Sequence, residues 1–343
     1  MPHRGVIVIL ACGLMSLLLS GLISCKRHSA GPPAPEVVVY CSVDQEIAEP
    51  ILQEFEKSCG IKVRARFDTE ASKTVGLVQR LRAEAATPAA DVFWSGEIFH
   101  TLRLAREGLL AEYAAPVTAE RPASFRDPAG RWHGLALRAR VIVYNTQHVP
   151  AAEAPRALED LLAPRWRGRL VLAAPEFGTT GGDIASWFAH YGPERARQIL
   201  RQLKENQVRL APGNSTVVRL VATGQADVGC TDTDDVYAGQ RNGWPVAFHY
   251  LDQNGAGPLV IPNTVALVRG GPHPEPAGRL IDYLLSAEVE RRLVESDSHN
   301  TPVHAALAKE YPAYQIPTTL SLDYEKIADQ LPSAIQAAGE ILR

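Results

Sequence analysis

The sequence lacks the motifs on which most enzyme classes depend. It contains no Gly-x-Ser-x-Gly nucleophile turn, no His-Glu-x-x-His zinc motif and no phosphate-binding P-loop, and its ten histidines show no metal-ligand spacing. It has no basic patch, so nucleic acid is not an expected partner, and no segment repeats at a fixed period. What remains is a globular composition of 343 residues, 46% hydrophobic with a net charge of −3, which is long enough for two lobes. We therefore expect a protein that is not an enzyme.

Cysteine is scarce, and its odd number excludes a complete set of internal disulfides. Cys12 and Cys25 belong to the N-terminal region, which leaves Cys41, Cys59 and Cys230. A helix of roughly 20 Å separates Cys41 from Cys59, so these two are not expected to pair. Three roles are considered for Cys41 and Cys230: small core residues, soft metal ligands or a disulfide between lobes.

The N-terminal region differs from the rest of the chain. Residues 1–24 have a short positive start and an apolar run over 5–22, which is typical of a secretory signal peptide. A permanent membrane anchor is the alternative for a run of this length. The Leu-Ile-Ser-Cys sequence ending at Cys25 resembles the lipoprotein box of bacteria, in which the cysteine is acylated. Residues 25–36, rich in glycine and proline, then form a lipidated N-terminus and tether. We expect an exported protein, held in the periplasm or cell envelope by lipid in a membrane.

The remaining chain alternates strand-like and helix-like segments. Short β-branched runs are followed by apolar residues at helical spacing, and this order predicts parallel strands with helical crossovers in an α/β fold. The pattern starts again after about residue 168, so two α/β units are expected. The expected strands are 37–40, 62–67, 91–94, 169–172, 208–210, 226–229 and 264–268, and the expected helices are 44–60, 75–81, 98–108, 182–190, 194–204, one ending at 224, and 276–293.

Acidic residues collect where the strands end. Ligands of open α/β sheets bind beyond the carboxyl ends of the strands, which makes 41–44, 95–97 and 231–235 ligand-facing segments. Asp234 and Asp235 are adjacent, and neighbouring carboxylates repel each other unless a cation, an amine or an arginine lies between them. The acidic segment therefore raises the question of which positive group it faces.

Helix capping is the ordinary alternative for each acid taken alone. Asp44, Glu97 and Asp232 each stand next to the expected start of a helix, where a carboxylate accepts bonds from free backbone N–H groups. Capping explains the pair Asp234 and Asp235 less well, because a cap needs only one carboxylate.

Seven short segments follow one another from about residue 37 to about residue 302. They are Val39–Ser42, Ala90–Phe93, Gly108–Leu110, Arg138–Asn145, Trp166–Gly168, Gly213–Ser215 and Ala226–Gly229. Together they resemble the ferric-ion-binding branch of bacterial extracellular solute-binding proteins. The resemblance implies a monomer that delivers its ligand to the permease and ATPase of an ABC importer.

The resemblance also implies a two-lobed periplasmic-binding-protein fold of type II, with the ligand cleft between the lobes. We expect lobe 1 to contain residues 37–137 plus 263–313, and lobe 2 to contain 138–262 plus 314–343. The chain would cross between them near 137–143 and 262–265, which gives the paired hinge that lets the lobes close.

The site departs from that branch, which holds Fe(III) with two adjacent tyrosines, a histidine and a glutamate. Here the tyrosine pair falls on Asp234 and Asp235, the histidine on Asp44, and the glutamate on Gly96 with Glu97 beside it. A shell of carboxylates replaces phenolates and imidazole. Carboxylate oxygens suit hard cations, so Fe(III), Mn(II), Ca(II) and Mg(II) are all candidates, with Fe(III) implied by the resemblance. Asp44, Glu97, Asp234 and Asp235 are the expected metal ligands.

An organic ligand is the alternative to a metal. Relatives in this superfamily carry thiamine or polyamines, and Tyr40, Trp94 and Tyr237 offer aromatic faces for a cation unless they only pack in the core. A zwitterion such as an aminophosphonate also fits, because 177–182 and 214–216 supply N–H groups and hydroxyls for an anion at helix starts. A ligand-sensing lipoprotein is the second functional alternative.

Two arginines complete the expected site. Arg138 and Arg140 either serve the anion or hold carboxylates at the hinge. The expected ligand-binding residues are Ser42, Asp44, Trp94, Glu97, Arg138, Arg140, Thr179, Thr180, Asn214, Asp232, Asp234, Asp235 and Tyr237.

Overall fold

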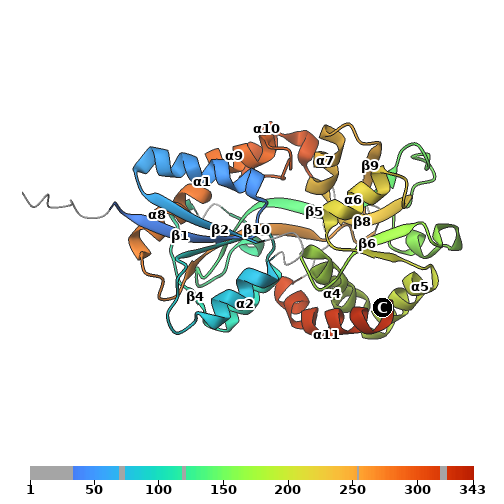
Figure 1. Cartoon of the computed structure of the whole chain (residues 1–343), viewed down its shortest axis with the longest axis horizontal. Helices are drawn as coiled ribbons and strands as arrows, with labels where there is room; N and C mark the ends of the chain where they lie inside the picture. The colour runs from blue at the N-terminus through green and yellow to red at the C-terminus, as the bar shows by residue number, and fades with distance from the viewer. Residues whose placement is uncertain (1–33, 69–73, 118–120, 253–254, 317–322) are drawn as a thin grey trace, which may run out of the picture. The chain divides into compact units, whose positions relative to one another are not determined.

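The computed structural model describes residues 34–343 apart from 69–73, 118–120, 253–254 and 317–322 (Figure 1). The stretch from Ala34 to Arg343 forms one compact unit. The expected signal peptide and Cys25 lie outside the described residues. Among the residues that are described, no helix combines the length and the apolar character needed to cross a membrane.

The first part of the chain alternates strands and helices as predicted. Its elements are β1 (Glu36–Cys41), α1 (Gln45–Cys59), β2 (Lys62–Phe67), α2 (Val75–Ala83), β3 (Val92–Ser95) and α3 (Phe99–Arg106). β1 pairs in parallel with β2 on one side and with β3 on the other, which confirms the parallel pairing expected for this part.

Strand alternation decides which helices cover this sheet. Val37 and Val39 point to the face that α1 and the later helices α8 and α9 cover, whereas Tyr40 and Phe93 point to the face covered by α2 and α3. Figure 1 shows α1 and α2 on opposite sides of β1 and β2. Both faces are apolar because both are covered by helices.

The second part of the chain repeats the pattern. Its elements are β6 (Leu170–Ala173), α4 (Thr179–Tyr191), α5 (Pro193–Glu205), β7 (Arg209–Ala211), α6 (Asn214–Ala222), β8 (Val228–Asp232), α7 (Thr233–Arg241) and β9 (Val246–Tyr250). β6 pairs in parallel with β7 and β8. Helix α4 begins three residues before the predicted residue 182, so Gly181 and Gly182 lie inside it. A Cβ on Gly182 would stand 2.1 Å from the Phe99 ring, so this glycine is what lets α4 pack tightly on α3.

Two long strands join the halves of the sheet. β5 (His133–Asn145) pairs antiparallel with β10 (Val260–Val268) through its first half and with β8 and β9 through its second half. β10 also pairs with β3 and with the short β4 (Leu110–Ala111), giving the order β2-β1-β3-β10-β5-β8-β6-β7. We call the strands from β2 to β10 the first half-sheet and those from β8 to β7, with β9, the second half-sheet; β5 joins them.

Both long strands are irregular at the same level. The register between β5 and β10 shifts between Pro262 and Asn263, and Ala136 opposite has a φ of 42°. The Asn263 side chain donates to the Ala136 carbonyl at 2.8 Å, which stabilises the bend. These irregularities lie where the sequence analysis expects the chain to pass between lobes.

The C-terminal part covers both half-sheets with helices. These are α8 (Pro274–Leu284), α9 (Ala287–Glu295), α10 (Ala305–Glu310) and α11 (Tyr324–Leu342), and short 3₁₀ turns occur at Ala123–Phe125, Glu159–Leu162, Pro164–Trp166 and Pro312–Tyr314. The single helix predicted over 276–293 is wrong. It is broken because Ser286 caps a new helix by accepting a bond from the Val289 N–H at 3.3 Å.

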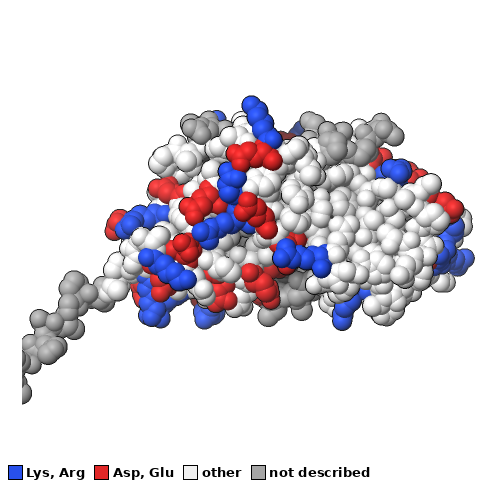
Figure 2. All heavy atoms as spheres, turned by 90° about the horizontal axis from the view of Figure 1, so that it is seen from above, with Lys and Arg blue, Asp and Glu red and all other residues white. Residues whose placement is uncertain are grey.

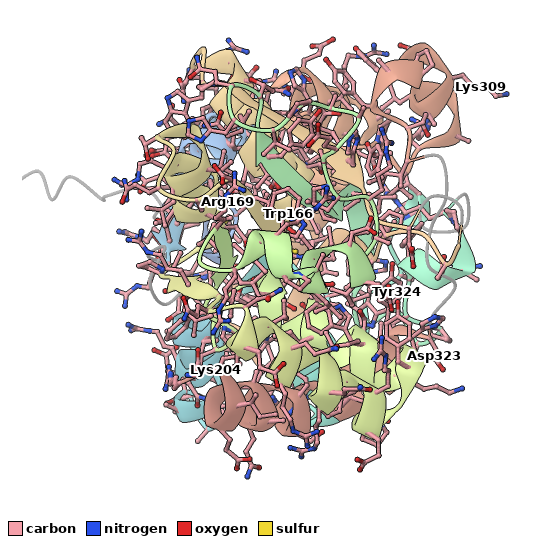
Figure 3. All side chains as sticks on the ribbon, turned by 90° about the vertical axis from the view of Figure 1, so that its right-hand side faces the viewer. Trp166, Arg169, Lys204, Lys309, Asp323 and Tyr324 are labelled. Carbon is pink, nitrogen blue, oxygen red and sulfur yellow. The ribbon has the colours of Figure 1, made fainter. Side chains whose placement is uncertain are left out.

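Helix α11 ties the last residues to the rest of the fold. It packs on α4, α5 and α3. Figure 3 labels Tyr324 at its start, where the hydroxyl donates to the Val260 carbonyl at 2.8 Å, and Lys204 of α5, which donates to the Leu342 carbonyl at 2.9 Å. The C-terminal helix is thus fixed at both ends.

Candidate functional site

A recess lies where the ends of β1, β3 and β8 meet the starts of α4 and α6. This is the position that the strand-end rule predicts for a ligand. The residues that line the recess are Ser42, Thr74, Glu97, Arg138, Phe177, Gly178, Thr179, Pro212, Gly213, Asn214, Asp232, Asp234 and Asp235.

Ser42 joins two strand ends at one wall of the recess. Its Oγ accepts from the Gly96 N–H at 3.0 Å and from the Thr74 hydroxyl at 3.1 Å, and it contacts Ser95 Oγ at 3.5 Å. These bonds hold the loops after β1 and β3 together, so this wall is preformed.

Arg140 is buried behind the opposite wall. Its side chain has no exposed surface, and Nε donates to Asp183 Oδ2 at 3.0 Å while Nη1 donates to Asp232 Oδ1 at 2.8 Å. Nη1 also contacts the Thr179 hydroxyl at 3.2 Å and Asn214 Oδ1 at 3.3 Å. All of these partners belong to α4, α6 and β8, so Arg140 organises the second half-sheet alone.

Arg138 lies two residues earlier on β5 and reaches into the recess. Nη1 donates to Asp234 Oδ2 at 2.8 Å, and Nη2 donates to the Gly96 carbonyl at 2.5 Å. Nε stands 3.4 Å from Asp232 Oδ2, an ionic contact without hydrogen-bond geometry. Arg138 therefore contacts both half-sheets, because Gly96 follows β3 and Asp234 follows β8.

The three aspartates after β8 form one cluster. Carboxylate oxygens of Asp232, Asp234 and Asp235 all lie within 4.8 Å of one another. Asp232 is the most tightly held, since it also accepts from Thr179 Oγ1 at 2.6 Å and from Asn214 Nδ2 at 3.0 Å. Asp234 and Asp235 are less enclosed and face the recess, where they are the groups best placed to meet a ligand.

The lining of the recess carries an excess of negative charge. Among the described residues of the lining, Glu97, Asp232, Asp234 and Asp235 stand against one guanidinium, that of Arg138, which leaves a formal charge of −3 when all are ionised. On the face of the molecule that Figure 2 displays, acidic and basic side chains are intermixed. The recess therefore favours a ligand that brings positive charge.

Burial and ion pairing set the charge states around Arg140. Burial alone would raise the pKa of the Asp232 carboxyl, but Arg140 and Arg138 hold it below its usual range. Burial raises the pKa of Asp183, and Arg140 offsets this only in part. Burial alone would lower the pKa of both guanidinium groups. The surrounding carboxylates raise the pKa of each, so Arg138 and Arg140 both stay charged.

The opposite side of the recess offers donors for an anion. Helices α4 and α6 begin at this wall with Gly178 and Gly213 at their N-caps, and neither cap has a side chain that accepts from the first turn. Thr180 Oγ1 contacts Asn214 Oδ1 at 3.3 Å. Among the described residues none accepts from the buried Arg140 Nη2. Two helix starts and an unpaired guanidinium nitrogen suit a small anion.

The sequence family described as bacterial extracellular solute-binding protein matches residues 37–296, more than half of the chain. This protein belongs to that family. The Fe(3+)-binding periplasmic protein of Serratia marcescens is 29% identical over 217 residues, which are 63% of this chain and 62% of that relative. A putative 2-aminoethylphosphonate-binding periplasmic protein of Salmonella typhimurium is 28% identical over 249 residues, 70% of this chain and 69% of the relative.

Solved structures agree with the family. The apo ferric ion-binding protein A of Pasteurella haemolytica has a TM-score of 0.78 to this chain at 26% identity, covering 90% of this chain and 98% of that one. The expected α/β periplasmic-binding-protein fold and the expected solute-binding class are therefore confirmed.

Two expected metal ligands of this solute-binding protein have different surroundings. The Glu97 carboxylate accepts from the Phe99 N–H at 2.7 Å and from the His100 N–H at 3.2 Å, and it contacts His100 Nδ1 at 3.1 Å. Glu97 thus caps α3, as the ordinary alternative expected, while it lines the recess. Asp44 stands at the N-cap of α1 without a side-chain capping bond. It lies with Asp234 and Asp235 along a neighbouring recess, outside the main one.

The structure does not bring the predicted aromatic residues to the main recess. Trp94 has no exposed surface and packs in the core of the first half-sheet. Tyr237 packs edge-on against Phe248, His299 and Tyr314. Their interpretation as faces for a cation is therefore wrong for this site, and core packing is the outcome. Strand alternation turns Trp94 toward α1, away from the ligand.

The three cysteines among the described residues of the solute-binding protein are free thiols. Cys41 and Cys230 are buried and Cys59 is partly buried. Burial raises the pKa of Cys230 to about 12 and that of Cys41 as well, so neither thiol ionises readily. Neither Cys41 nor Cys230 is among the residues lining the recess, which leaves the core interpretation.

Two residues of the site were missed from the sequence. Thr74 lines the recess just before α2, and nothing in its neighbourhood predicts it. The buried charge of Asp183 could have been predicted, because this residue is a single acid at the start of the apolar run Ile184–Phe188. A charge in an otherwise buried helix usually has a buried partner, which here is Arg140.

Proposed function

We propose that this chain is the ligand-binding component of an ABC importer and that it captures a hard metal cation, with Fe(III) as the first candidate. The observation that carries the proposal is the cluster of Asp232, Asp234 and Asp235, whose oxygens lie within 4.8 Å of one another in a recess with excess negative charge. Carboxylate oxygens are the ligands that hard cations prefer. The Serratia marcescens relative, described as Fe(3+)-binding, supports the choice of metal.

The role that we propose for each carboxylate follows from how many hydrogen bonds it already accepts within the protein. Asp234 and Asp235 bind the cation, and Asp44 reaches it from the neighbouring recess when the lobes close. Asp232 and Glu97 hold their neighbours through several hydrogen bonds and add mainly charge. A small anion completes the site at the starts of α4 and α6, close to Arg140.

A zwitterion such as an aminophosphonate is the second candidate. The specific observation that favours it is that one recess has a wall of helix starts and a wall of carboxylates: α4 and α6 begin at the first wall, and Asp234 and Asp235 belong to the second. A phosphonate would lie on the first wall and its ammonium on the second. The similarity to the Salmonella typhimurium relative points the same way.

A binding comparison separates the two candidates. The double variant Asp234→Asn and Asp235→Asn removes two charges from the recess. We expect it to lose Fe(III) binding, measured by competition with citrate, while it keeps its fold. The matched control is Glu325→Gln with Asp329→Asn, which removes two exposed charges from α11. Unchanged Fe(III) affinity in the first variant would refute the metal site. Binding of 2-aminoethylphosphonate but not Fe(III) to the wild type would favour the second candidate.

The rest of the proposal concerns how the protein works in the cell. Residues 37–137 plus 263–313 and residues 138–262 plus 314–343 act as lobes that close around the ligand, with β5 and β10 as the hinge. X-ray scattering should show compaction on ligand binding, and the ligand should be recovered chemically unchanged, since a binding protein performs no reaction. A monomer docks on the permease, and the ATPase drives import. A ligand-sensing role remains the alternative and would leave uptake unchanged in a deletion strain.

Membrane attachment is proposed through Cys25. After removal of residues 1–24, acylation of this cysteine would hold the protein in the cell envelope, with 25–36 as the tether. Cys25→Ser should release soluble protein. Continued membrane retention with an intact N-terminus would mean that 5–22 is a permanent anchor.

A further inference from the structure

Arg138 occupies an unusual position between the two half-sheets. On β5 its neighbour across the ladder is Ile261 of β10, whereas Arg140 is already paired with Asp232 of β8. Ala139 is the last residue of β5 that pairs with β10, so Arg138 stands one residue before the position at which the strand changes partners. It also follows Ala136, whose φ of 42° marks the bend. A side chain at this point can reach groups on either side.

The guanidinium uses this position to join the half-sheets. Nη1 bonds to the Asp234 carboxylate at 2.8 Å and Nη2 to the Gly96 carbonyl at 2.5 Å. A guanidinium is planar, with donors in a fixed fork, so these two acceptors keep one separation only while both bonds are made. Any motion that moves Gly96 away from Asp234 must break one of them.

The loop after β3 is shaped for this contact. A Cβ built on Gly96 would lie 3.3 Å from Arg138 Nη2, tighter than most side-chain contacts. Gly96 therefore admits the guanidinium where a larger residue would push it aside. Arg138 is also 8% exposed, so its bonds face little competition from water.

Arg138 is at the same time the positive group next to the acidic cluster. Asp234, Asp232 and Asp235 all act on its charge, and among the described residues that line the recess it is the only cation. A metal ion bound by Asp234 would stand next to this guanidinium and would share a carboxylate with it. Two cations on one carboxylate repel each other.

We propose that Arg138 is a resident cation that clasps Gly96 to Asp234 when no ligand is bound, and that an incoming metal ion must displace it from Asp234. This rests on the proposed function for the metal, although the clasp itself does not require it. Arg138 then determines specificity, because only a ligand that binds the Asp234 carboxylate more strongly than the guanidinium does can displace Arg138. The protein also needs no ligand to hold its half-sheets together.

The test compares Arg138→Gln, Arg138→Lys and the control Arg82→Gln, which removes a charge whose partner Glu107 lies within the first half-sheet region. By scattering, ligand-free Arg138→Gln should be more expanded than the wild type, with Arg82→Gln unchanged. Its Fe(III) affinity, measured against citrate, should rise about tenfold because a competing charge is gone. Arg138→Lys keeps the charge but lacks the fork, so it should expand while its Fe(III) affinity stays near wild type.

A gain of affinity separates this role from a structural one, since damage to the fold would weaken binding. Gly96→Ala, which loosens the same contact from the other side, should expand the ligand-free protein even if Arg138→Gln does not fold. Identical ligand-free scattering of the wild type and the Arg138 and Gly96 variants would overturn the clasp, and so would weaker Fe(III) binding by Arg138→Gln. If the wild type binds no Fe(III), the proposed function fails, and scattering alone supports or overturns the clasp.

Discussion

Arg138 and Arg140 stand two residues apart on the same strand, and both are buried among carboxylates. Every partner of Arg140 lies in the second half-sheet, whereas the partners of Arg138 lie on both sides of the bend in β5. Arg140 therefore contributes to the stability of one region, and Arg138 to the relation between two regions. Similar chemistry gives different functions because the strand changes its pairing partner between them.

The largest contrast should appear in stability. Arg140→Met leaves Asp183 and Asp232 buried without their shared cation, and we expect a loss of about 3–5 kcal/mol in the free energy of unfolding. Arg138→Met should lose less, about 1–3 kcal/mol, because Asp234 lies closer to the solvent. Urea denaturation measures both, with Arg82→Met as the exposed control. Equal losses of unfolding free energy for Arg140→Met and Arg138→Met would contradict the different roles of the two arginines.

The two carboxylates on Arg140 sharpen the comparison through pH. The pKa of Asp232 is below its usual 3.8, so its contribution is present above that pH and is lost on acidification through the lower folded-state value. The pKa of Asp183 is raised, so its contribution is present below 3.8 and is lost as pH rises through the higher folded-state value.

Amide variants of these residues should therefore remove opposite contributions to the pH dependence of stability. Asp232→Asn should cost about 2 kcal/mol at neutral pH and flatten the acid side of the curve of unfolding free energy against pH. Asp183→Asn should cost less at neutral pH and flatten the curve above pH 3.8. Urea midpoints between about pH 3 and pH 7 test this. Parallel curves of unfolding free energy against pH for the two variants would contradict the opposite pKa shifts of Asp232 and Asp183.

The smallest effect separates two acids at helix starts. Glu97→Ala removes the acceptor of two N–H groups of α3, and we expect a loss of about 1 kcal/mol. Asp44→Ala removes no capping bond from α1, so we expect a smaller loss than for Glu97→Ala. Thermal unfolding of the two variants decides the matter, and a larger loss for Asp44→Ala would contradict it.

Much of the fold was predictable because it follows from local periodicity. The β-branched runs and helical spacings predicted most strands of both half-sheets, although β4, β5 and β9 were not predicted. The strand-end rule predicted a ligand-facing position for Ser42, Glu97 and Asp234, which all line the recess. Helix ends that depend on tertiary contacts were missed. Gly182 lies inside α4 only because Phe99 packs against it, and the sequence near Gly182 contains no trace of that contact.

The sequence predicted which types of residue form the site, but not which of these residues contact one another. Acidic residues at strand ends predicted an unusual charge, yet whether Arg138 or Arg140 would meet them depended on the pairing of β5 with β10 and β8, which are far away in the sequence. Trp94 was misplaced for a related reason. Alternation says that Trp94 and Phe93 face opposite ways, but it does not show that helices cover both faces and bury both side chains.

The position of β10 has a consequence for the order of folding. This strand lies between β3 and β5, so the first half-sheet has a gap until residues 260–268 have been synthesised. Most of the chain must be available before its N-terminal portion can complete a core, and contacts over such sequence distances form slowly. A nascent chain of this kind stays unfolded while it leaves the ribosome, and an unfolded chain can be threaded through a membrane pore.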